Sequence, residues 1–221
     1  PYTTLFRSSM TAAAHPPAAA HATPPRATWF CVDIECSGPI PGDYDMISLG
    51  AVRVHLGADD RYRVDPDGFY AEIRPTGPRV DPGAMKVNGL DIEALRRTGQ
   101  PLRDALAALT AFVEAHTLPG SRPVFVGHNA PFDWSFVNHG YHAVGLPNPF
   151  GYKALDTKAL SMGVLGLHWF DSNKEELAAA LPLPAVQADQ VHRADYDARY
   201  QAHILAALLE RGGFASRDRR A

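Results

Sequence analysis

Asp33 and Glu35 are two acidic residues in a stretch, residues 29–35, that otherwise predicts a β-strand. The stretch is rich in aromatic and β-branched residues, and a Ser-Gly-Pro segment follows it. Because side chains alternate along a strand, the two carboxylates share one face. Neighbouring carboxylates repel each other unless a cation lies between them, and hard oxygen ligands suit Mg²⁺ or Mn²⁺. The pair therefore indicates a metal site, and the alternative is the solvated face of an edge strand.

Two further aspartates occupy positions where a catalytic role and an ordinary structural role both fit. Asp133 follows the apolar run 123–127 and falls in the first turn of a predicted helix, where the helix dipole stabilises any carboxylate. Asp197 lies on the apolar stripe of the last predicted helix, and a carboxylate buried there is costly without a cation or a donor. His192 comes five positions earlier, in the preceding loop, where it is either a surface histidine or a group that reaches the site.

The order of the predicted elements places these residues in one mixed sheet. Three strands with short connections come first and predict an antiparallel meander. Strands that alternate with helices follow, so we expect an α/β fold with helices on both faces of the sheet. The expected strands are residues 29–35, 45–55, 68–74, 123–127 and 151–155, and the expected helices are residues 82–85, 101–116, 157–162, 173–181 and 194–211, with two more that begin near residues 91 and 131.

Composition and charge restrict the class of protein. The chain has 221 residues, of which 46% are hydrophobic and 20% charged, as in a globular domain. Its net charge of −3 argues against nucleic-acid binding by bulk positive charge, although two divalent ions would raise the total to about +1. No apolar run is long enough to span a membrane, and Cys31 and Cys36 are not expected to pair. We therefore predict a cytoplasmic protein.

Both ends of the chain are predicted to lie outside the folded domain. Residues 1–27 are expected to be a disordered leader rich in alanine, proline and histidine. Its first eight residues resemble a translated sequencing adapter rather than a native start. The domain is expected to span residues 28–213, and the arginine-rich residues 214–221 are expected to be a disordered tail.

The acidic residues and the histidine stand in three motifs that resemble those of the DEDDh 3′→5′ exonuclease family. In order, the motifs are Asp33-x-Glu35, His-Asn-Ala-x-Phe-Asp at residues 128–133, and His192-x-Ala-x-x-Asp197. The resemblance covers residues 28–211, and the family includes polymerase proofreading subunits, ribonuclease T and oligoribonuclease. One departure is Cys36, which stands where the family commonly has threonine, and it bears on substrate preference rather than on activity.

The resemblance implies a fold, a mechanism and a set of contacts. The fold is a ribonuclease H-like mixed five-stranded sheet, with three antiparallel strands and then two parallel strands, flanked by helices. Two divalent ions, Mg²⁺ or Mn²⁺, would be held by the four carboxylates, with Asp33 between both ions and His192 as general base. The residues implied in contact with the terminal nucleotide are Cys36, Ser37, Leu49, Asn129 and Phe132.

We therefore predict a metal-dependent 3′→5′ exonuclease that acts on single-stranded DNA, RNA or short oligonucleotides and releases nucleoside 5′-monophosphates. Two alternatives stay open. One is a non-catalytic nucleic-acid-binding scaffold with an exonuclease fold, and the other is a small-molecule nucleotide phosphatase. Aromatic faces for base stacking are offered by Phe132, Trp134 and Trp169, although Phe132 and Trp134 open a helix beside a central strand, where aromatic residues are more often part of the core. A homodimer and a polymerase partner are both expected candidates for assembly.

Overall fold

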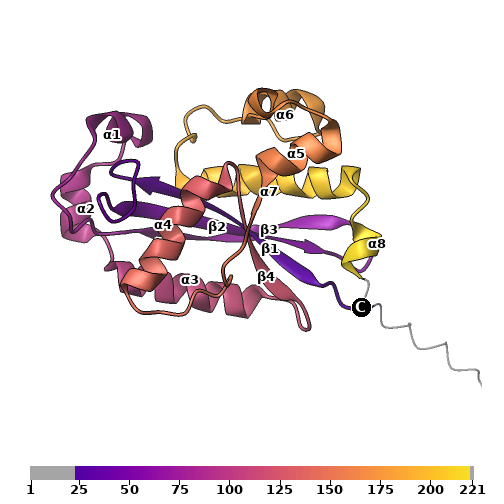
Figure 1. Cartoon of the computed structure of the whole chain (residues 1–221), viewed down its shortest axis with the longest axis horizontal. Helices are drawn as coiled ribbons and strands as arrows, with labels where there is room; N and C mark the ends of the chain where they lie inside the picture. The colour runs from indigo at the N-terminus through magenta and orange to yellow at the C-terminus, as the bar shows by residue number, and fades with distance from the viewer. Residues whose placement is uncertain (1–22, 220–221) are drawn as a thin grey trace, which may run out of the picture.

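The apolar stretch around Asp33 forms β1 (Ala27–Cys36), the central strand of a five-stranded sheet in the computed structural model, which describes residues 23–219 (Figure 1). The strand order is β3-β2-β1-β4-β5. β2 is antiparallel to both β1 and β3, whereas β4 is parallel to β1 and β5 is parallel to β4. The other strands are β2 (Met46–Leu56), β3 (Tyr62–Glu72), β4 (Arg122–Gly127) and β5 (Ala154–Asp156). The predicted mixed sheet is confirmed.

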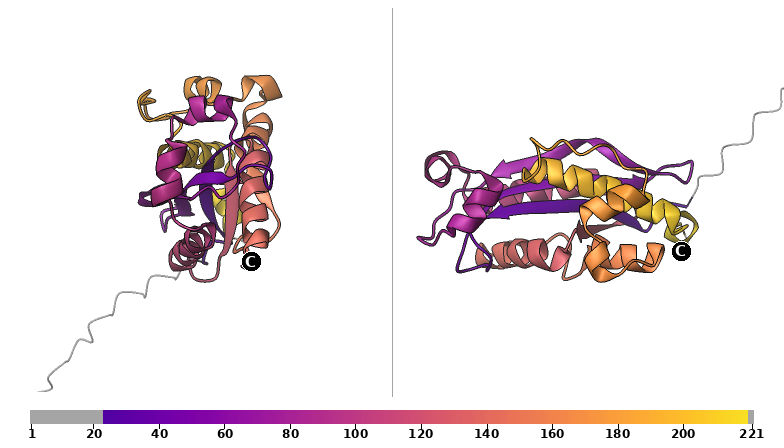
Figure 2. Two further views of the ribbon diagram at one scale, coloured as in Figure 1. Left: turned by 90° about the vertical axis from the view of Figure 1, so that its left-hand side faces the viewer. Right: turned by 90° about the horizontal axis from the view of Figure 1, so that it is seen from above.

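Each face of the sheet is covered by helices with a core of their own (Figure 2). On one face, apolar side chains of β1 pack against α3 (Leu102–His116) and α4 (Ala130–Ala143). On the other face they pack against α7 (Ala194–Arg211), through Ala198, Ala202, Leu205 and Leu209. The remaining helices are α1 (Pro82–Asn88), α2 (Ile92–Thr98), α5 (Thr157–Leu165), the short 3₁₀ helix η1 (Trp169–Asp171), α6 (Lys174–Ala180) and α8 (Ala215–Asp218). The stripe of α7 predicted to face the sheet, with Tyr200, Ile204 and Leu208, is buried but packs against Leu177 of α6 instead. In residues 23–219, no helix combines the length and the apolar character needed to cross a membrane.

Two strands differ from their predicted bounds. The third strand begins at Tyr62 rather than at residue 68, because Tyr62 and Val64 pair with the far end of β2 and a register shift in β2 absorbs the irregular stretch between. The fifth strand covers only Ala154–Asp156, since Gly151 adopts a left-handed conformation in the preceding turn. Neither difference moves a residue of the three motifs.

The predicted disordered tail is wrong for residues 214–219. There α8 packs against the start of β1, and Asp218 accepts hydrogen bonds from the backbone N–H groups of Arg26 and Ala27. Arg219 donates to the carboxylate of Asp60 and to backbone carbonyls. The folded part of the chain therefore extends past the predicted boundary at residue 213. The predicted leader falls almost wholly on residues 1–22, which lie outside the described residues.

Candidate active site

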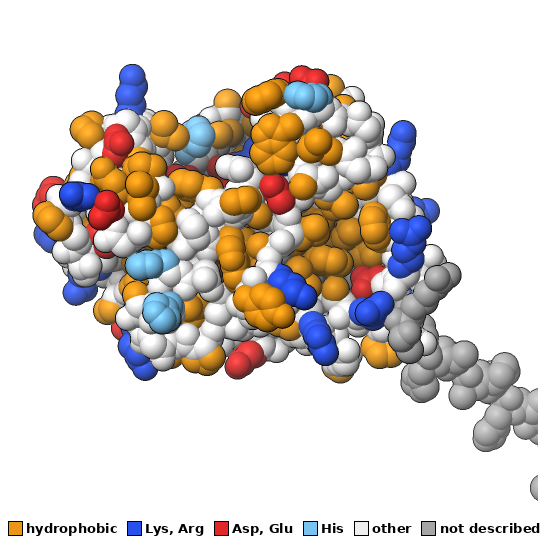
Figure 3. Space-filling model, viewed as in Figure 1, with side chains coloured by type: hydrophobic (Ala, Val, Ile, Leu, Met, Phe, Trp, Pro, Cys, Tyr) orange, Lys and Arg blue, Asp and Glu red, His pale blue; other side chains and the backbone are white. Residues whose placement is uncertain are grey.

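One face of the molecule is hollowed between α1 and α6, and acidic, basic and histidine side chains meet in this hollow (Figure 3). Beside it lies a pocket of about 520 Å³, which we call the lysine pocket. Its walls come from the end of β4, from α5, from α6 and from the loop before α7. The residues that line it are His128, Asn129, Lys158, Trp169, Asn173, Lys174, Glu175, Val191 and His192.

Asp33 and Glu35 lie on the face of β1 that α7 covers. The alternation is as predicted, since Phe30, Val32 and Ile34 belong to the core on the opposite face. Both acidic residues are half-buried, and β1 has a hydrogen-bonded neighbour on each side. The alternative of an edge strand is therefore wrong for β1. Asp33 and Glu35 pair with β2 and lie just past Cys31, the last residue of β1 that pairs with β4.

Asp133 joins this pair from the first turn of α4, which follows directly after β4. Its side chain is buried, and its Oδ1 accepts a hydrogen bond of 3.1 Å from the backbone N–H of Ile34. Since Ile34 lies between Asp33 and Glu35 in β1, this bond fixes the third carboxylate beside the first two. The parallel pairing of β4 with β1 brings the start of α4 to this position.

Asp197 arrives from the other side of the sheet because α7 approaches β2 unusually closely. Gly50 of β2 pairs with Asp33, and a Cβ atom at Gly50 would lie 2.2 Å from the backbone carbonyl oxygen of Ala194. Only glycine leaves room for the first turn of α7 at this point. That turn carries Asp197, which is 4% exposed, to the same region as the β1 carboxylates.

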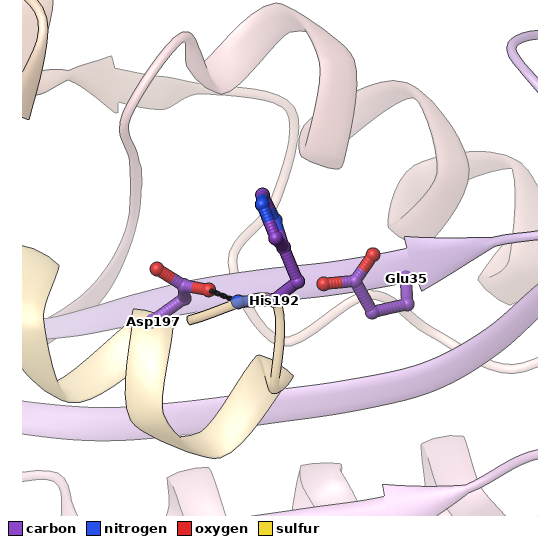
Figure 4. Close-up of side chains that lie close together, drawn as sticks. All are labelled: Glu35, His192 and Asp197. Carbon is purple, nitrogen blue, oxygen red and sulfur yellow. Dashed lines mark hydrogen bonds between the residues drawn. The ribbon is translucent and has the colours of Figure 1, made fainter. Parts of the chain in front are cut away.

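His192 precedes α7 in a left-handed conformation with a φ of 67°, which is uncommon for a residue with a Cβ. Its backbone N–H donates a 2.7 Å hydrogen bond to Oδ2 of Asp197, which anchors this part of the loop. The exposed imidazole extends between Asp197 and Glu35 (Figure 4). One potential ligand atom from each of these three residues lies within 4.8 Å of the other two. The five motif residues therefore converge, and the loop carries His192 to the acidic group.

Burial and mutual repulsion destabilise the ionised form of these carboxyl groups. Burial, and then the neighbouring Asp133, raises the pKa of Asp33 well above its ordinary value. Burial followed by Asp197 raises the pKa of Glu35 to about 8. Burial raises the pKa of Asp133 to about 7, although the N–H of Ile34 opposes the rise. Carboxylates in this state gain from a bound cation, and their oxygens are the donors that Mg²⁺ and Mn²⁺ prefer. The residues therefore fit a divalent metal centre.

Two residues that contact the acidic group escaped the sequence analysis. Lys174 donates to Oδ1 of Asp197 from the first position of α6, and no spacing in the sequence pointed to it. Gln201 donates a 2.6 Å hydrogen bond from Nε2 to Oδ1 of Asp33 and is 1% exposed. Gln201 lies four positions after Asp197, hence on the same stripe of α7, and this periodicity was a signal that would have found it.

His128 of the second motif has a different environment from His192. Its ring is half-buried and its Nδ1 shares a 2.9 Å hydrogen bond with Oγ1 of Thr157. Burial, followed by the positive charges of Lys174 and Lys158, lowers the pKa of His128 to about 3. His128 is therefore a neutral hydrogen-bonding wall of the lysine pocket at neutral pH.

The predicted nucleotide contacts are divided between exposed and buried side chains. Phe132 is 37% exposed, and Asn129 is exposed in a left-handed conformation at the mouth of the lysine pocket. The side chain of Cys36 is buried, and that of Ser37 hydrogen-bonds to the backbone of Asp45 and Arg79. Their backbone is engaged as well, since the N–H of Ser37 donates to the carbonyl of Asp45 at 2.8 Å and the carbonyl of Cys36 accepts from Nδ2 of Asn88 at 3.2 Å.

Leu49 is the predicted contact that the structure does not favour. Its side chain is fully buried in the core against α3 and α4. The position was predicted from the motif context alone, which does not reveal that a residue of β2 opposite Ile34 turns to the interior face. Trp134 is also a core residue, because its ring packs edge-to-face on Phe125 at 5.1 Å.

Comparisons with known proteins agree with this geometry. Residues 30–205 match the model of an exonuclease family named RNase_T. The 3′-5′ DNA exonuclease Cap18 of Escherichia coli is 36% identical over 177 residues, which cover 80% of this chain and 89% of that protein. The family model spans all three motifs, and the match to Cap18 covers nearly the whole length of that relative.

Solved structures show the same fold. The nuclease domain of 3′hExo, a DEDDh family member bound to rAMP, has a TM-score of 0.64 at 11% identity, over 88% of this chain and 96% of that one. E. coli exonuclease I in complex with a dT13 oligonucleotide has a TM-score of 0.58 at 16% identity and covers 87% of this chain. This chain spans only 42% of exonuclease I. From the match of the family model and from the likeness to Cap18, the chain belongs to the RNase_T family of exonucleases.

Proposed function

We propose that this protein is a metal-dependent 3′→5′ exonuclease that removes nucleoside 5′-monophosphates from the 3′ end of single-stranded DNA or RNA. The observation that carries the proposal is the convergence of four carboxylates and His192 from four separate segments of the chain. Support for the substrate comes from relatives, since Cap18 is named a DNA exonuclease and exonuclease I was solved with an oligonucleotide.

Two divalent ions, Mg²⁺ or Mn²⁺, are part of the proposal. Asp33, Glu35 and Asp197 would hold one ion, and Asp33 with Asp133 would hold the other. Bound there, the ions would stabilise the attacking and leaving oxygens of a phosphodiester. The protein itself contributes the rigid placement of these carboxylates, through the N–H of Ile34 for Asp133 and the amide of Gln201 for Asp33.

His192 is proposed as the general base. An exposed imidazole beside the carboxylates takes a proton from the attacking water, while the P–O3′ bond breaks and the leaving O3′ is protonated by solvent. His128 is unsuited to this role because its lowered pKa makes it a weak base near neutral pH. The assignment therefore rests on the contrast between the two histidines.

The test uses oligonucleotides labelled at the 5′ end, as single-stranded DNA and RNA of equal sequence, with Mn²⁺. A ladder of products that shorten from the 3′ end, lost in Asp33→Ala by on the order of 10³-fold, is expected because one electrostatic partner of the transition state is removed. Asp104→Ala, at an exposed acidic residue of α3, is the matched control and should keep full activity.

Other outcomes of the same assay separate the alternatives. Binding of the oligonucleotide with no shortening would favour the scaffold, and release of phosphate from free nucleotides alone would favour the phosphatase. The cytoplasmic location stays a proposal, supported by two free buried cysteines, Cys31 and Cys36. A homodimer or a polymerase partner stays a prediction.

A further inference from the structure

Lys174 is the one lysine or arginine of the described residues that forms an ion pair with any of the four site carboxylates. It stands at the first position of α6, and its Nζ donates to Oδ1 of Asp197. The lysine side chain is 28% exposed, whereas that of Asp197 is 6% exposed. The ammonium group therefore lies at the edge of the acidic group, with its partner inside and solvent behind it.

Both carboxylate oxygens of Asp197 accept a hydrogen bond. Oδ2 already accepts the backbone N–H of His192 at 2.7 Å, and Oδ1 accepts Lys174. A divalent ion of this class binds a carboxylate oxygen at about 2.1 Å, inside the space that an ammonium group on the same oxygen occupies. The two cations also repel each other. Lys174 and a metal ion therefore compete for Oδ1 of Asp197.

Lys174 also lines the lysine pocket, so its ammonium group can turn toward that pocket when it leaves Asp197. In that pocket Lys158 is already fixed, with its Nζ 2.6 Å from Oδ1 of Asn173 and 5.0 Å from the centre of the Trp169 ring. A released Lys174 adds a second positive charge on the same side of the acidic group. An oxygen of a phosphate bound over the carboxylates is the anion that this ammonium group would meet.

We propose that Lys174 exchanges partners during the reaction: it neutralises Asp197 in the metal-free protein, yields Oδ1 to a divalent ion, and then binds a non-bridging oxygen of the scissile phosphate. The inference rests on the proposed metal-dependent function and adds a substrate-binding residue to it. It also explains how a buried acidic group remains folded without metal, because Lys174 supplies the neutralising charge.

The first experiment uses Mn²⁺ alone, without nucleic acid, in a calorimetric titration. Lys174→Met and Lys174→Gln are expected to bind Mn²⁺ more tightly by on the order of tenfold, the scale on which groups bonded to metal ligands change metal affinity. Lys174→Arg keeps the competing charge and should stay near the wild type. Lys153→Met, at an exposed lysine, is the control and should leave the affinity unchanged. Equal Mn²⁺ affinity in the wild type and both neutral variants would overturn the exchange.

The second experiment measures binding of a nucleoside 5′-monophosphate at saturating Mn²⁺. Lys174→Met is expected to bind it about tenfold more weakly, as for the loss of one charge-assisted hydrogen bond to a phosphate oxygen. Unchanged nucleotide affinity would overturn the phosphate contact. The metal titration does not depend on turnover, so a wild-type protein that shortens no oligonucleotide would refute the proposed function without deciding the exchange.

Discussion

Asp197 and Asp218 are both buried aspartates near the C-terminal end of the chain, but they serve opposite ends of β1. Asp218 is surrounded by neutral donors: the N–H groups of Arg26 and Ala27 reach Oδ1 at 3.2 Å, and the hydroxyl of Tyr62 reaches Oδ2 at 3.2 Å. Asp197 is placed among other carboxylates instead, and its only cationic partner among the described residues is Lys174.

Within one sheet, Asp218 contributes to stability, whereas Asp197 belongs to the candidate active site. A buried carboxylate that receives several hydrogen bonds from neutral groups ties distant segments together, as Asp218 does for the start of β1 and α8. A buried carboxylate that faces other carboxylates costs stability and gains it back only with a cation. Substitutions at the two ends of β1 should therefore have opposite signatures, one in activity and one in unfolding.

Among substitutions that leave every carboxylate in place, the largest effect is expected from Gly50→Ala, at the catalytic end of the comparison. The new Cβ would lie 2.2 Å from the carbonyl oxygen of Ala194, so the first turn of α7 must move away. A displacement of about 1 Å costs on the order of 10²-fold in turnover when it misplaces a reacting group. The measurement is kcat/KM on a labelled oligonucleotide, together with the melting temperature.

Gly163→Ala is the matched control, because its new Cβ meets open space on an exposed position of α5. Alanine there should raise stability by about 0.5–1 kcal/mol and leave turnover unchanged. Full activity in Gly50→Ala would show that the close approach of α7 to β2 does not set the position of Asp197.

A smaller loss of turnover is expected from Gln201→Leu. This substitution removes a neutral hydrogen-bond donor from the end of β1 that carries the site carboxylates. Asp33 loses the 2.6 Å hydrogen bond that orients it, while leucine fills a similar volume. Outer groups that orient metal ligands change metal affinity by about 10–100-fold when removed. We expect weaker Mn²⁺ binding in calorimetry and a lower kcat with little change in KM. Gln100→Leu, at an exposed glutamine, should match the wild type, and unchanged Mn²⁺ affinity in Gln201→Leu would exclude a positioning role.

At the other end of β1, Asp218→Ala should lower the free energy of unfolding and leave the rate of catalysis unchanged. The substitution removes the acceptor of the Ala27 N–H and of the Tyr62 hydroxyl, whereas the N–H of Arg26 keeps the backbone carbonyl of Asp218 at 2.7 Å. The lost hydrogen bonds cost about 1–3 kcal/mol in total stability. For a domain of this size that lowers the melting temperature by roughly 2–4 °C for each kcal/mol. Turnover of the folded variant at a temperature well below its melting point should equal that of the wild type. A loss of activity there would mean that the two ends of β1 are coupled.

The motif residues were predictable because their spacing encodes both chemistry and placement. Alternation put Asp33 and Glu35 on one face of β1, and the apolar stripe of α7 identified Asp197 as a buried charge. Lys174 was not predictable in this way. It reaches Asp197 from a different helix, and a single lysine at the start of a short helix is indistinguishable in sequence from an ordinary surface charge.

Two other expectations, for the tail and for Leu49, differ from the structure for the same reason. The tail was expected to be disordered because Arg217 and Arg219 suggest a solvated end, but Arg219 is paired with Asp60, a residue distant in sequence. Leu49 was assigned to the nucleotide from its motif, whereas its pairing opposite Ile34 turns it into the core. Contacts between distant segments decided both cases, and the sequence pattern around each residue does not contain them.

The smallest expected effect is a dependence of stability on pH in the metal-free protein. Burial raises the pKa of Glu35 to about 8 and that of Asp133 to about 7, so the folded state binds protons that the unfolded state has already lost. The stability that these protons contribute is fully present below the ordinary carboxyl range and is lost as pH rises through about 7 and 8. In EDTA the melting temperature should therefore fall from pH 5.5 to pH 8.5.

Mn²⁺ should abolish or reverse this trend, because metal ions bind the deprotonated carboxylates and stabilise the folded state. Asp133→Asn removes one of the two titrating groups and should flatten the curve in EDTA, whereas Asp218→Ala should lower the melting temperature equally at every pH. Parallel curves for the wild type and Asp133→Asn in EDTA would mean that the acidic group does not hold extra protons. The site carboxylates and Asp218 would then not differ in their need for a neutralising charge.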